Sequence, residues 1–283
     1  MARHGAGAAR LLLLFGTPSL GAVTVGALVC ALSGIPASLW LRNIAAWVVG
    51  AVVAIVIART GGPRALPFIL WAAPLGLAAA LLSAGQDGVH RWVNAGPVSL
   101  NAAMLLLPMA VVSLAVLAAR RWAWLPAFLV LAILAAQPDA SQATAFGSAM
   151  GLIALTGASG GRTKGVIVLA AAVLIAVAWL RPDPLQPVPE VEQIMDLAFR
   201  LTPLLAALAV ALLTGACLAP GLAARQGPRD LHIAGLALSA CLAAWAIMPY
   251  LGHFPVPLVG IGLSPIVGAW LAVGLLAGLM RRG

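Results

Sequence analysis

Residues 201–219 read LTPLLAALAVALLTGACLA and contain no charged side chain. The run is continuously apolar and lacks the strict alternation of apolar and polar residues that a half-buried strand shows. A backbone that crosses lipid must satisfy its own hydrogen bonds, which leaves helices and closed barrels as spanning structures. This run therefore predicts a membrane-spanning helix.

Similar apolar runs recur along the whole chain. Of its 283 residues, 63% are apolar and 8% are charged, and the mean hydropathy of +1.08 lies far outside the range of soluble domains. Because one span takes roughly 20 apolar residues, we predict an all-α polytopic membrane protein with about ten transmembrane helices in a single integral membrane domain, residues 1–283. The expected spans are 13–36, 43–58, 66–84, 101–118, 123–137, 141–158, 165–180, 197–219, 231–250 and 264–280.

Two segments can be interpreted in more than one way. The fifth and sixth spans meet at AAQPDASQAT (135–144) and could instead form one re-entrant unit. The beginning, MARHGAGAARLLLLFG (1–16), has the charge pattern of a signal peptide. Since no soluble domain follows it, we expect an uncleaved first span.

The basic residues indicate the orientation. With a cytoplasmic N-terminus, twelve of the sixteen Lys and Arg residues fall in inner segments, one pair in each. This bias predicts that both termini are cytoplasmic. Isolated pairs do not make the basic groove that nucleic acid requires, so we expect no nucleic-acid partner. The outer segments keep Arg42, Arg91, Arg181 and Arg200.

The acidic residues sort the other way. Six of the seven fall in outer segments and only Asp230 is inside. Carboxylates contribute little to orientation, so this distribution indicates either a solvated outer surface or chemistry on the outer face.

The three cysteines lie inside apolar runs, without a CxxC motif and without histidines beside them. Buried free thiols are the expected state of Cys30, Cys217 and Cys241. We expect no disulfide framework, no metal site and no cofactor, and the sequence gives no indication of a divalent cation.

The outer segment SAGQDGVHRWVNAGPVSLN (83–101) admits two interpretations. It is either an interfacial loop with Trp92 anchored at the level of the headgroups, or a site where Arg91 clamps a phosphate. If the segment is helical, Asp87 and Arg91 are spaced to form an ion pair.

Two further outer segments carry polar groups among apolar ones. Asp139 follows a proline at a helix boundary and is predicted to cap the sixth span. The connection LGHFPVPLVGIGLSP (251–265) is long and apolar, and at membrane depth such backbone must be buried in protein or line a cavity. We expect His253 on the surface.

Four of the seven acidic residues lie in WLRPDPLQPVPEVEQIMDLAFR (179–200). The prolines at 182, 184, 187 and 189 predict an extended, stiff segment. The following EVEQIMDLAF has the spacing of an amphipathic helix that leads into the eighth span. Glu190, Glu192 and Asp196 fit the acidic start of a helix, whereas Asp183 lies upstream of it and remains unexplained.

Several of these segments, in order, resemble motifs of the SEDS family of membrane glycosyltransferases. GVHRWVNAGPVS (88–99) is similar to the family's G-x-R-R-W-[IV]…GP-[FV]-S stretch, and Gln137, Pro138 and Asp139 match its QPD motif. GHFPVPLVGIGLS…GLMRR (252–282) resembles the family's closing segment. Asp183-Pro184-Leu185 stands at the place of the D-P-[LF]-G motif in the outer loop after the seventh span.

The resemblance implies peptidoglycan glycosyltransfer in cell-wall synthesis, elongation or division. A lipid-linked disaccharide such as lipid II would be polymerised with release of polyprenyl diphosphate, at the outer face of the bacterial cytoplasmic membrane and often beside a penicillin-binding transpeptidase. It implies Asp183 as the general base, which fits a reaction that removes a hydroxyl proton. The residues expected to bind substrate are Arg91, Trp92, Asp139, Arg181, Glu190 and Arg200.

The chain departs from the family at three places. The PSE motif and the lysine after it, on the fourth span, are replaced by Ala102-Ala103-Met104 and Leu107, and SYGG has become residues 260–263, GIGL. Gln186 replaces the glycine after Asp-Pro-Leu. Two alternatives therefore stay open: a non-catalytic scaffold or regulator of a cell-wall complex, and a transporter of lipid-linked precursor. Transport requires alternating access, which the gathering of acids on one face does not favour.

Overall fold

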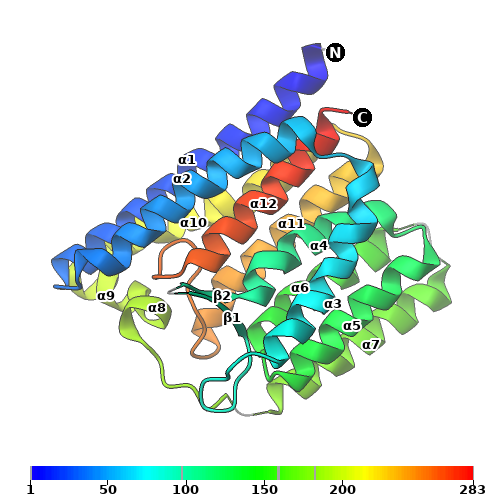
Figure 1. Ribbon diagram of the computed structural model, residues 1–283. Helices are drawn as coiled ribbons and strands as arrows, with labels where there is room; N and C mark the ends of the chain where they lie inside the picture. Colours follow the sequence, from blue (N-terminus) through cyan, green and yellow to red (C-terminus); the bar gives the residue numbers. More distant parts are fainter. Residues whose placement is uncertain (1, 97, 158–159, 182, 283) are drawn as a thin grey trace.

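The computed structural model describes residues 2–96, 98–157, 160–181 and 183–282 (Figure 1). Pro97 and Pro182 of the segments above, and residues 158–159, lie outside this part of the chain. The helices are α1 (Ala2–Leu32), α2 (Ala37–Thr60), α3 (Leu66–Leu81), α4 (Ala102–Leu117), α5 (Trp124–Ala136), α6 (Ala140–Thr156), α7 (Gly161–Trp179), α8 (Pro189–Glu192), α9 (Ile194–Leu201), α10 (Pro203–Ala224), α11 (Arg229–Ile247) and α12 (Leu263–Met280). Single 3-10 turns occupy Pro63–Ala65, Arg121–Ala123 and Met248–Tyr250.

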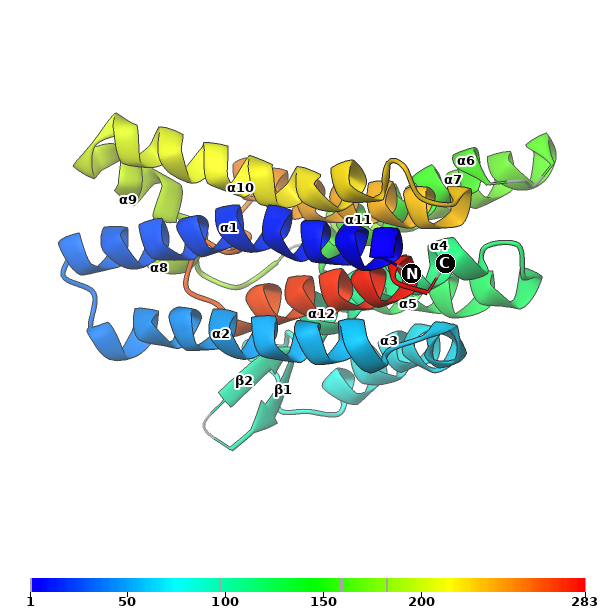
Figure 2. The same ribbon diagram turned by 90° about the horizontal axis from the view of Figure 1, so that it is seen from above.

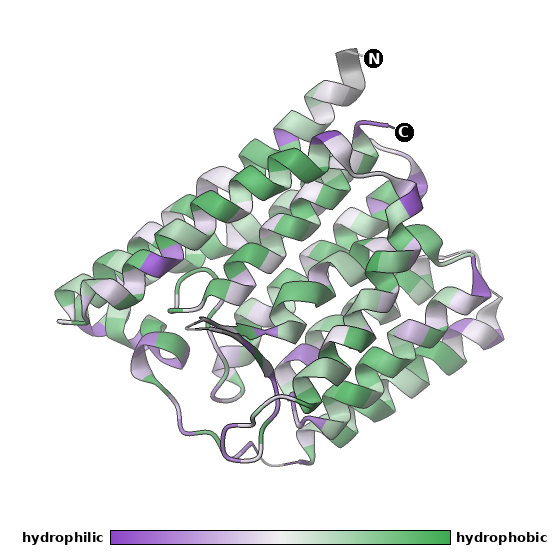
Figure 3. Ribbon diagram, in the orientation of Figure 1, coloured by the Kyte–Doolittle hydropathy of each residue, from purple (hydrophilic) through white to green (hydrophobic). Residues whose placement is uncertain are grey.

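The helices confirm the predicted all-α polytopic membrane fold. Within the described residues, seven helices are long and apolar enough to cross a membrane, and α4 and α5 are shorter apolar helices. α12 packs against α1, α2 and α4, and 78% of its residues are buried. Hydrophobic residues occupy most of the length of the helices, and hydrophilic residues lie mainly near the helix ends and in the connections (Figure 3).

Both termini lie at one end of the bundle (Figure 1). Basic side chains cap helix ends there: Arg282 donates to the carbonyls of Arg59 and Thr60 at 3.2 and 2.9 Å, and Arg229 donates to Thr156 at 2.8 Å. Cations at helix C-termini are stabilising because they meet the unpaired carbonyls and the negative end of the helix dipole. Basic residues that the charge pattern assigned to the inner side therefore lie at the same end as the termini.

The opposite end holds the longer connections and a small sheet (Figure 1). β1 (Trp92–Ala95) and β2 (Val98–Asn101) pair antiparallel, with Trp92 opposite Asn101, and the hairpin projects from the side of the bundle (Figure 2). Gly96, at the turn, has φ +61°, which a glycine adopts without strain. The described residues of 83–101 form no helix, so the condition under which Asp87 and Arg91 were expected to pair is not met.

The eighth expected span, 197–219, is divided in the structure. α9 ends at Leu201 and α10 begins at Pro203, with Thr202 extended between them at φ −166°. Proline disfavours a helical conformation in the residue before it, and the Thr202 hydroxyl accepts from the amide of Leu204 at 3.4 Å. The amphipathic helix therefore ends before the span, and the prediction of one continuous segment is wrong.

The boundaries of the first helix also differ from the expected ones. α1 begins at Ala2 and ends at Leu32, so it extends further toward the N-terminus than the expected span 13–36 and stops short of its end. Gly34, with φ +76°, lies in the turn that follows.

The connection at residues 251–262 folds into the bundle, as expected for apolar backbone at membrane depth. Leu258 and Val259 are 4% and 1% exposed. The Asn43 amide on α2 ties the connection down: it donates to the carbonyl of Gly260 at 2.8 Å and accepts from the amide of Gly262 at 3.0 Å.

The same connection also holds α8. The amide of Val256 donates to Val191 at 3.1 Å, and the amide of Ile261 donates to Glu190 at 2.9 Å. Residues 189–192, which the sequence places on an outer loop, are therefore fixed to a buried part of the bundle.

We expect Gly268→Ala to destabilise the fold, because a Cβ at Gly268 would overlap the carbonyl oxygen of Met104 on α4. Overpacking of this kind costs about 1–3 kcal/mol. Gly151→Ala on α6 is the matched control, since a Cβ there meets nothing within 4 Å. The measurement is thermal unfolding in detergent, and equal unfolding temperatures for the two variants would contradict close packing of α12 on α4.

Candidate functional site

A cleft opens at the end of the bundle that carries the hairpin. It encloses about 410 Å³ of empty space, including the part open to solvent. Its walls come from segments far apart in the sequence: the hairpin, the start of α4, the α5–α6 junction, the proline-rich segment, α8 and the connection before α12. The lining residues are Arg91, Trp92, Asn101, Met104, Asp139, Ser141, Asp183, Leu185, Gln186, Glu192, His253, Phe254 and Pro255.

Arg91 joins three of these segments. Its Nη2 donates to Asp183 Oδ2 at 2.8 Å and to the carbonyl of Pro138 at 2.6 Å. Its Nε lies 3.5 Å from Asp139 Oδ2. The Arg91 side chain is 7% exposed, so this is a largely buried cation between two carboxylates.

These partners stabilise the charged form of Arg91. Burial acts to lower the pKa of the guanidinium, but the carboxylates of Asp139 and Asp183 outweigh it and raise the pKa above its ordinary value. In the described part of the chain, neither Nε nor Nη1 makes a hydrogen bond: Nε is buried and has only its ion pair with Asp139, whereas Nη1 is not buried in this way. Because Arg91 lines the cleft, Nη1 is available to an anionic ligand.

The two carboxylate oxygens of Asp139 have different partners. As predicted, Asp139 caps α6: Oδ1 accepts from the amide of Gln142 at 3.3 Å, and also from the hydroxyl of Ser141 at 3.2 Å. Its other oxygen, Oδ2, faces Arg91. The carboxylate thus satisfies a helix N-terminus with one oxygen and a cation with the other.

Asp183 is more open than its partners, with 23% of its side chain exposed. Oδ2 accepts from Arg91, and Oδ1 accepts from the amide of Leu185 at 3.2 Å. An ionised carboxylate has about four lone-pair sites, so each oxygen can still accept a proton from a ligand in the cleft.

Sequence reasoning missed two titratable groups of the cleft. Glu192 accepts from the amide of Val188 at 2.7 Å, as a helix-start acid does, and also lines the cleft. Burial raises the pKa of Glu192, while its hydrogen bond to the amide of Val188 acts to lower it. His253 is exposed, as expected, yet lies at the cleft. The contacts of α8 with the buried connection bring both there, and no local pattern encodes those contacts.

Three residues expected to bind substrate are not among those that line the cleft. Arg181 is exposed and donates to the carbonyl of Ala135 at 3.2 Å. Arg200 is exposed at the end of α9, and Glu190 holds the connection before α12 through its backbone. Of the residues expected at the site, the structure brings Arg91, Trp92, Asp139 and Asp183 together.

The wall formed by α4 is apolar. Met104 on α4 lines the cleft, and Leu107 is fully buried. Within the described ranges, no group of three or more His, Cys, Asp or Glu side chains is placed to hold a metal ion. The gap between the carboxylates of Asp139 and Asp183 is bridged by the guanidinium of Arg91.

Comparisons with solved structures identify the fold. The chain is similar to the rod shape determining protein RodA of Thermus thermophilus, with a TM-score of 0.68, 16% identity and 96% coverage of each chain. A RodA variant with an aspartate replaced by alanine matches with a TM-score of 0.67, 18% identity and 96% coverage of each chain. This chain has a SEDS-like fold.

A further match concerns an assembly. A chain of a peptidoglycan synthase complex, from a structure that describes the coordination of polymerisation and crosslinking, has a TM-score of 0.63 and 17% identity. The match covers 96% of this chain and 97% of that one. No protein-family model and no curated protein matches the sequence. The SEDS-like chain therefore shares a whole fold with these proteins at low identity.

Proposed function

We propose that this SEDS-like protein polymerises a polyprenyl-diphosphate-linked disaccharide of the lipid II type into glycan, at the outer face of the bacterial cytoplasmic membrane. The observation that carries the proposal is the ion-pair cluster of Arg91, Asp139 and Asp183 in one cleft. The SEDS-like fold supports the same reaction class, since the matched proteins are named for rod shape and peptidoglycan synthesis.

The cleft offers the two groups that glycosyl transfer requires. The acceptor hydroxyl attacks the anomeric carbon of the donor, the bond from that carbon to the diphosphate oxygen breaks, and polyprenyl diphosphate leaves. Asp183 takes the hydroxyl proton as general base. Arg91 donates from Nη1 to the diphosphate, whose negative charge grows in the transition state.

A second candidate function is favoured by the apolar wall of the cleft. Met104 and Leu107 stand where the family carries a glutamate and a lysine. Charged groups inside membrane proteins are usually functional, so their absence favours a protein that binds the precursor and scaffolds a cell-wall complex without polymerising. A penicillin-binding transpeptidase is the proposed partner in either case.

The deciding experiment uses the purified full chain in lipid nanodiscs with labelled lipid-linked disaccharide. We expect glycan polymer on a gel, and polyprenyl diphosphate released in proportion to it. Binding of the precursor without polymer would overturn the enzymatic proposal in favour of the scaffold. Neither binding nor polymer would overturn both functions.

A further inference from the structure

A chain of hydrogen bonds runs from Asp139 into the bundle. The hydroxyl of Ser141 donates to Asp139 Oδ1 at 3.2 Å, and Gln142 Nε2 donates to Ser141 Oγ at 3.4 Å. At the far end, Trp245 Nε1 on α11 donates to Gln142 Oε1 at 2.8 Å. All four residues are buried, with exposures of 2% for Asp139, 3% for Ser141, 0% for Gln142 and 2% for Trp245.

The formation of α6 does not require this row of hydrogen bonds. Asp139 already caps α6, and the side chain of Gln142 hydrogen-bonds to Ser141 and Trp245 instead of to the amides of the helix start. A buried amide costs free energy unless its partners are in place. The partners here are specific: Gln142 Oε1 accepts a hydrogen bond from Trp245 and Nε2 donates one to Ser141, so the amide oxygen and nitrogen are oriented.

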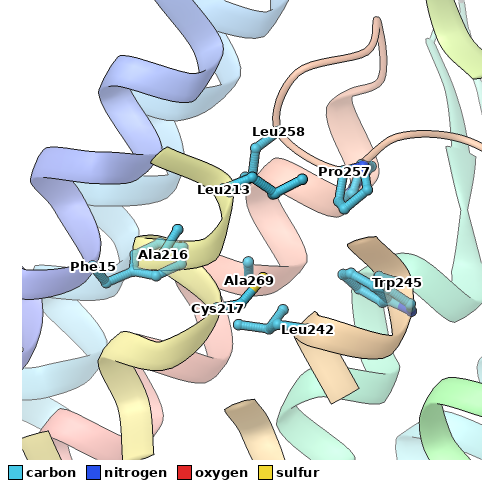
Figure 4. A pocket seen from close by; sticks show the side chains of 10 residues that line it. Phe15, Leu213, Ala216, Cys217, Leu242, Trp245, Pro257, Leu258 and Ala269 are labelled. Atoms are coloured by element: carbon cyan, nitrogen blue, oxygen red, sulfur yellow. The ribbon is translucent and has the colours of Figure 1, made fainter. Parts of the chain in front are cut away.

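Trp245 is itself firmly placed. Trp245 is 2% exposed, and its ring lies beside an apolar pocket that Phe15, Leu213 and Leu258 also line (Figure 4). The buried indole directs its N–H toward Gln142. This arrangement fixes the indole nitrogen as an anchor for the polar chain.

We propose that Gln142 and Trp245 are positioning residues that hold the carboxylate of Asp139 against Arg91. Ser141 and the amide of Gln142 retain Oδ1, which leaves Oδ2 for the guanidinium. Without the anchor, Ser141 and the carboxylate turn more freely and Arg91 loses one of its two anionic partners. Weaker binding of the diphosphate by Arg91 would be a consequence that rests on the proposed function. The loss of the contact between Asp139 and Arg91 does not rest on it.

The test measures how fast phenylglyoxal modifies Arg91, read by mass spectrometry of the full chain in nanodiscs. Trp245→Phe and Gln142→Leu are each expected to speed modification about fivefold, the factor that one hydrogen bond is worth. Trp47→Phe is the matched control. Its indole donates to the hydroxyl of Ser19 at 3.0 Å, and Trp47 does not line the cleft. Its modification rate at Arg91 is expected to equal that of the wild type.

Two further variants separate positioning from a general loss of packing. If Trp245 acts through Gln142, the double variant should modify no faster than the faster single variant. Ser141→Ala should also expose Arg91, while Ser141→Thr, which keeps a hydroxyl, should restore protection. An unchanged rate at Arg91 in both single variants, with a lowered unfolding temperature like that of Trp47→Phe, would overturn the positioning role.

The polymerisation assay then adds the functional consequence. Because Arg91 is proposed to donate to a diphosphate whose negative charge grows in the transition state, Trp245→Phe should lower kcat and kcat/KM together. An inactive wild type would remove the proposed function, yet the Arg91 modification result would still decide the positioning role.

Discussion

Asp183→Asn is expected to lower the rate of glycan polymerisation by about a hundredfold to ten-thousandfold, the contribution typical of a general base. Asparagine keeps the shape of the side chain and an oxygen that can accept the amide of Leu185, as Asp183 does at 3.2 Å. It loses the capacity to take a proton. Arg91 retains Asp139 as a counterion, so folding and membrane insertion should remain intact.

Asp196→Asn provides the comparison for this variant. Asp196 lies in the same acidic segment, is exposed on α9 and does not line the cleft. Its variant should polymerise at the rate of the wild type, measured with the same labelled precursor. Full activity of Asp183→Asn would move the general base elsewhere, and Glu192 is then the next carboxylate of the cleft to replace.

Arg91→Met is expected to reduce the free energy of unfolding by about 3–5 kcal/mol, the usual cost when one partner of a buried ion pair is removed. The variant leaves the side chains of Asp139 (3% exposed) and Asp183 (23% exposed) without their cation. Methionine fills a similar volume, so the loss comes from uncompensated charge. The measurement is denaturant or thermal unfolding in detergent at neutral pH.

A second substitution tests this explanation. Adding Asp139→Asn to Arg91→Met should recover part of the lost stability, because the more deeply buried charge is then removed as well. Arg181→Met, at an exposed arginine, should cost at most about 1 kcal/mol. A similar cost for Arg91→Met would mean that the cluster is effectively solvated.

Most of the secondary structure could be predicted from the sequence, for a physical reason. In lipid the backbone must be satisfied locally, so apolar runs such as residues 201–219 specify helices without reference to their neighbours. The exceptions depend on single residues: Thr202 before Pro203 interrupts a helix, and Gly96 allows a hairpin turn.

The candidate site was only partly predictable. Asp139 and Asp183 were singled out by their position beside prolines and by the motifs they match, and Arg91 as one of the few outer cations. Their mutual distances were not, because ion pairs between residues 91, 139 and 183 depend on how three connections fold onto one end of the bundle. Glu192 lines the cleft because α8 is hydrogen-bonded to the connection before α12.

The sequence by itself determined that this chain is a helical membrane protein with acidic groups concentrated in the connections of one end. Hydropathy and charge act residue by residue, so a linear pattern carries that information. Only the tertiary structure decided that Arg91 lies between Asp139 and Asp183, and that the indole of Trp245 donates to Gln142 within the bundle. Those contacts join residues more than forty positions apart, and packing between helices brings such residues together.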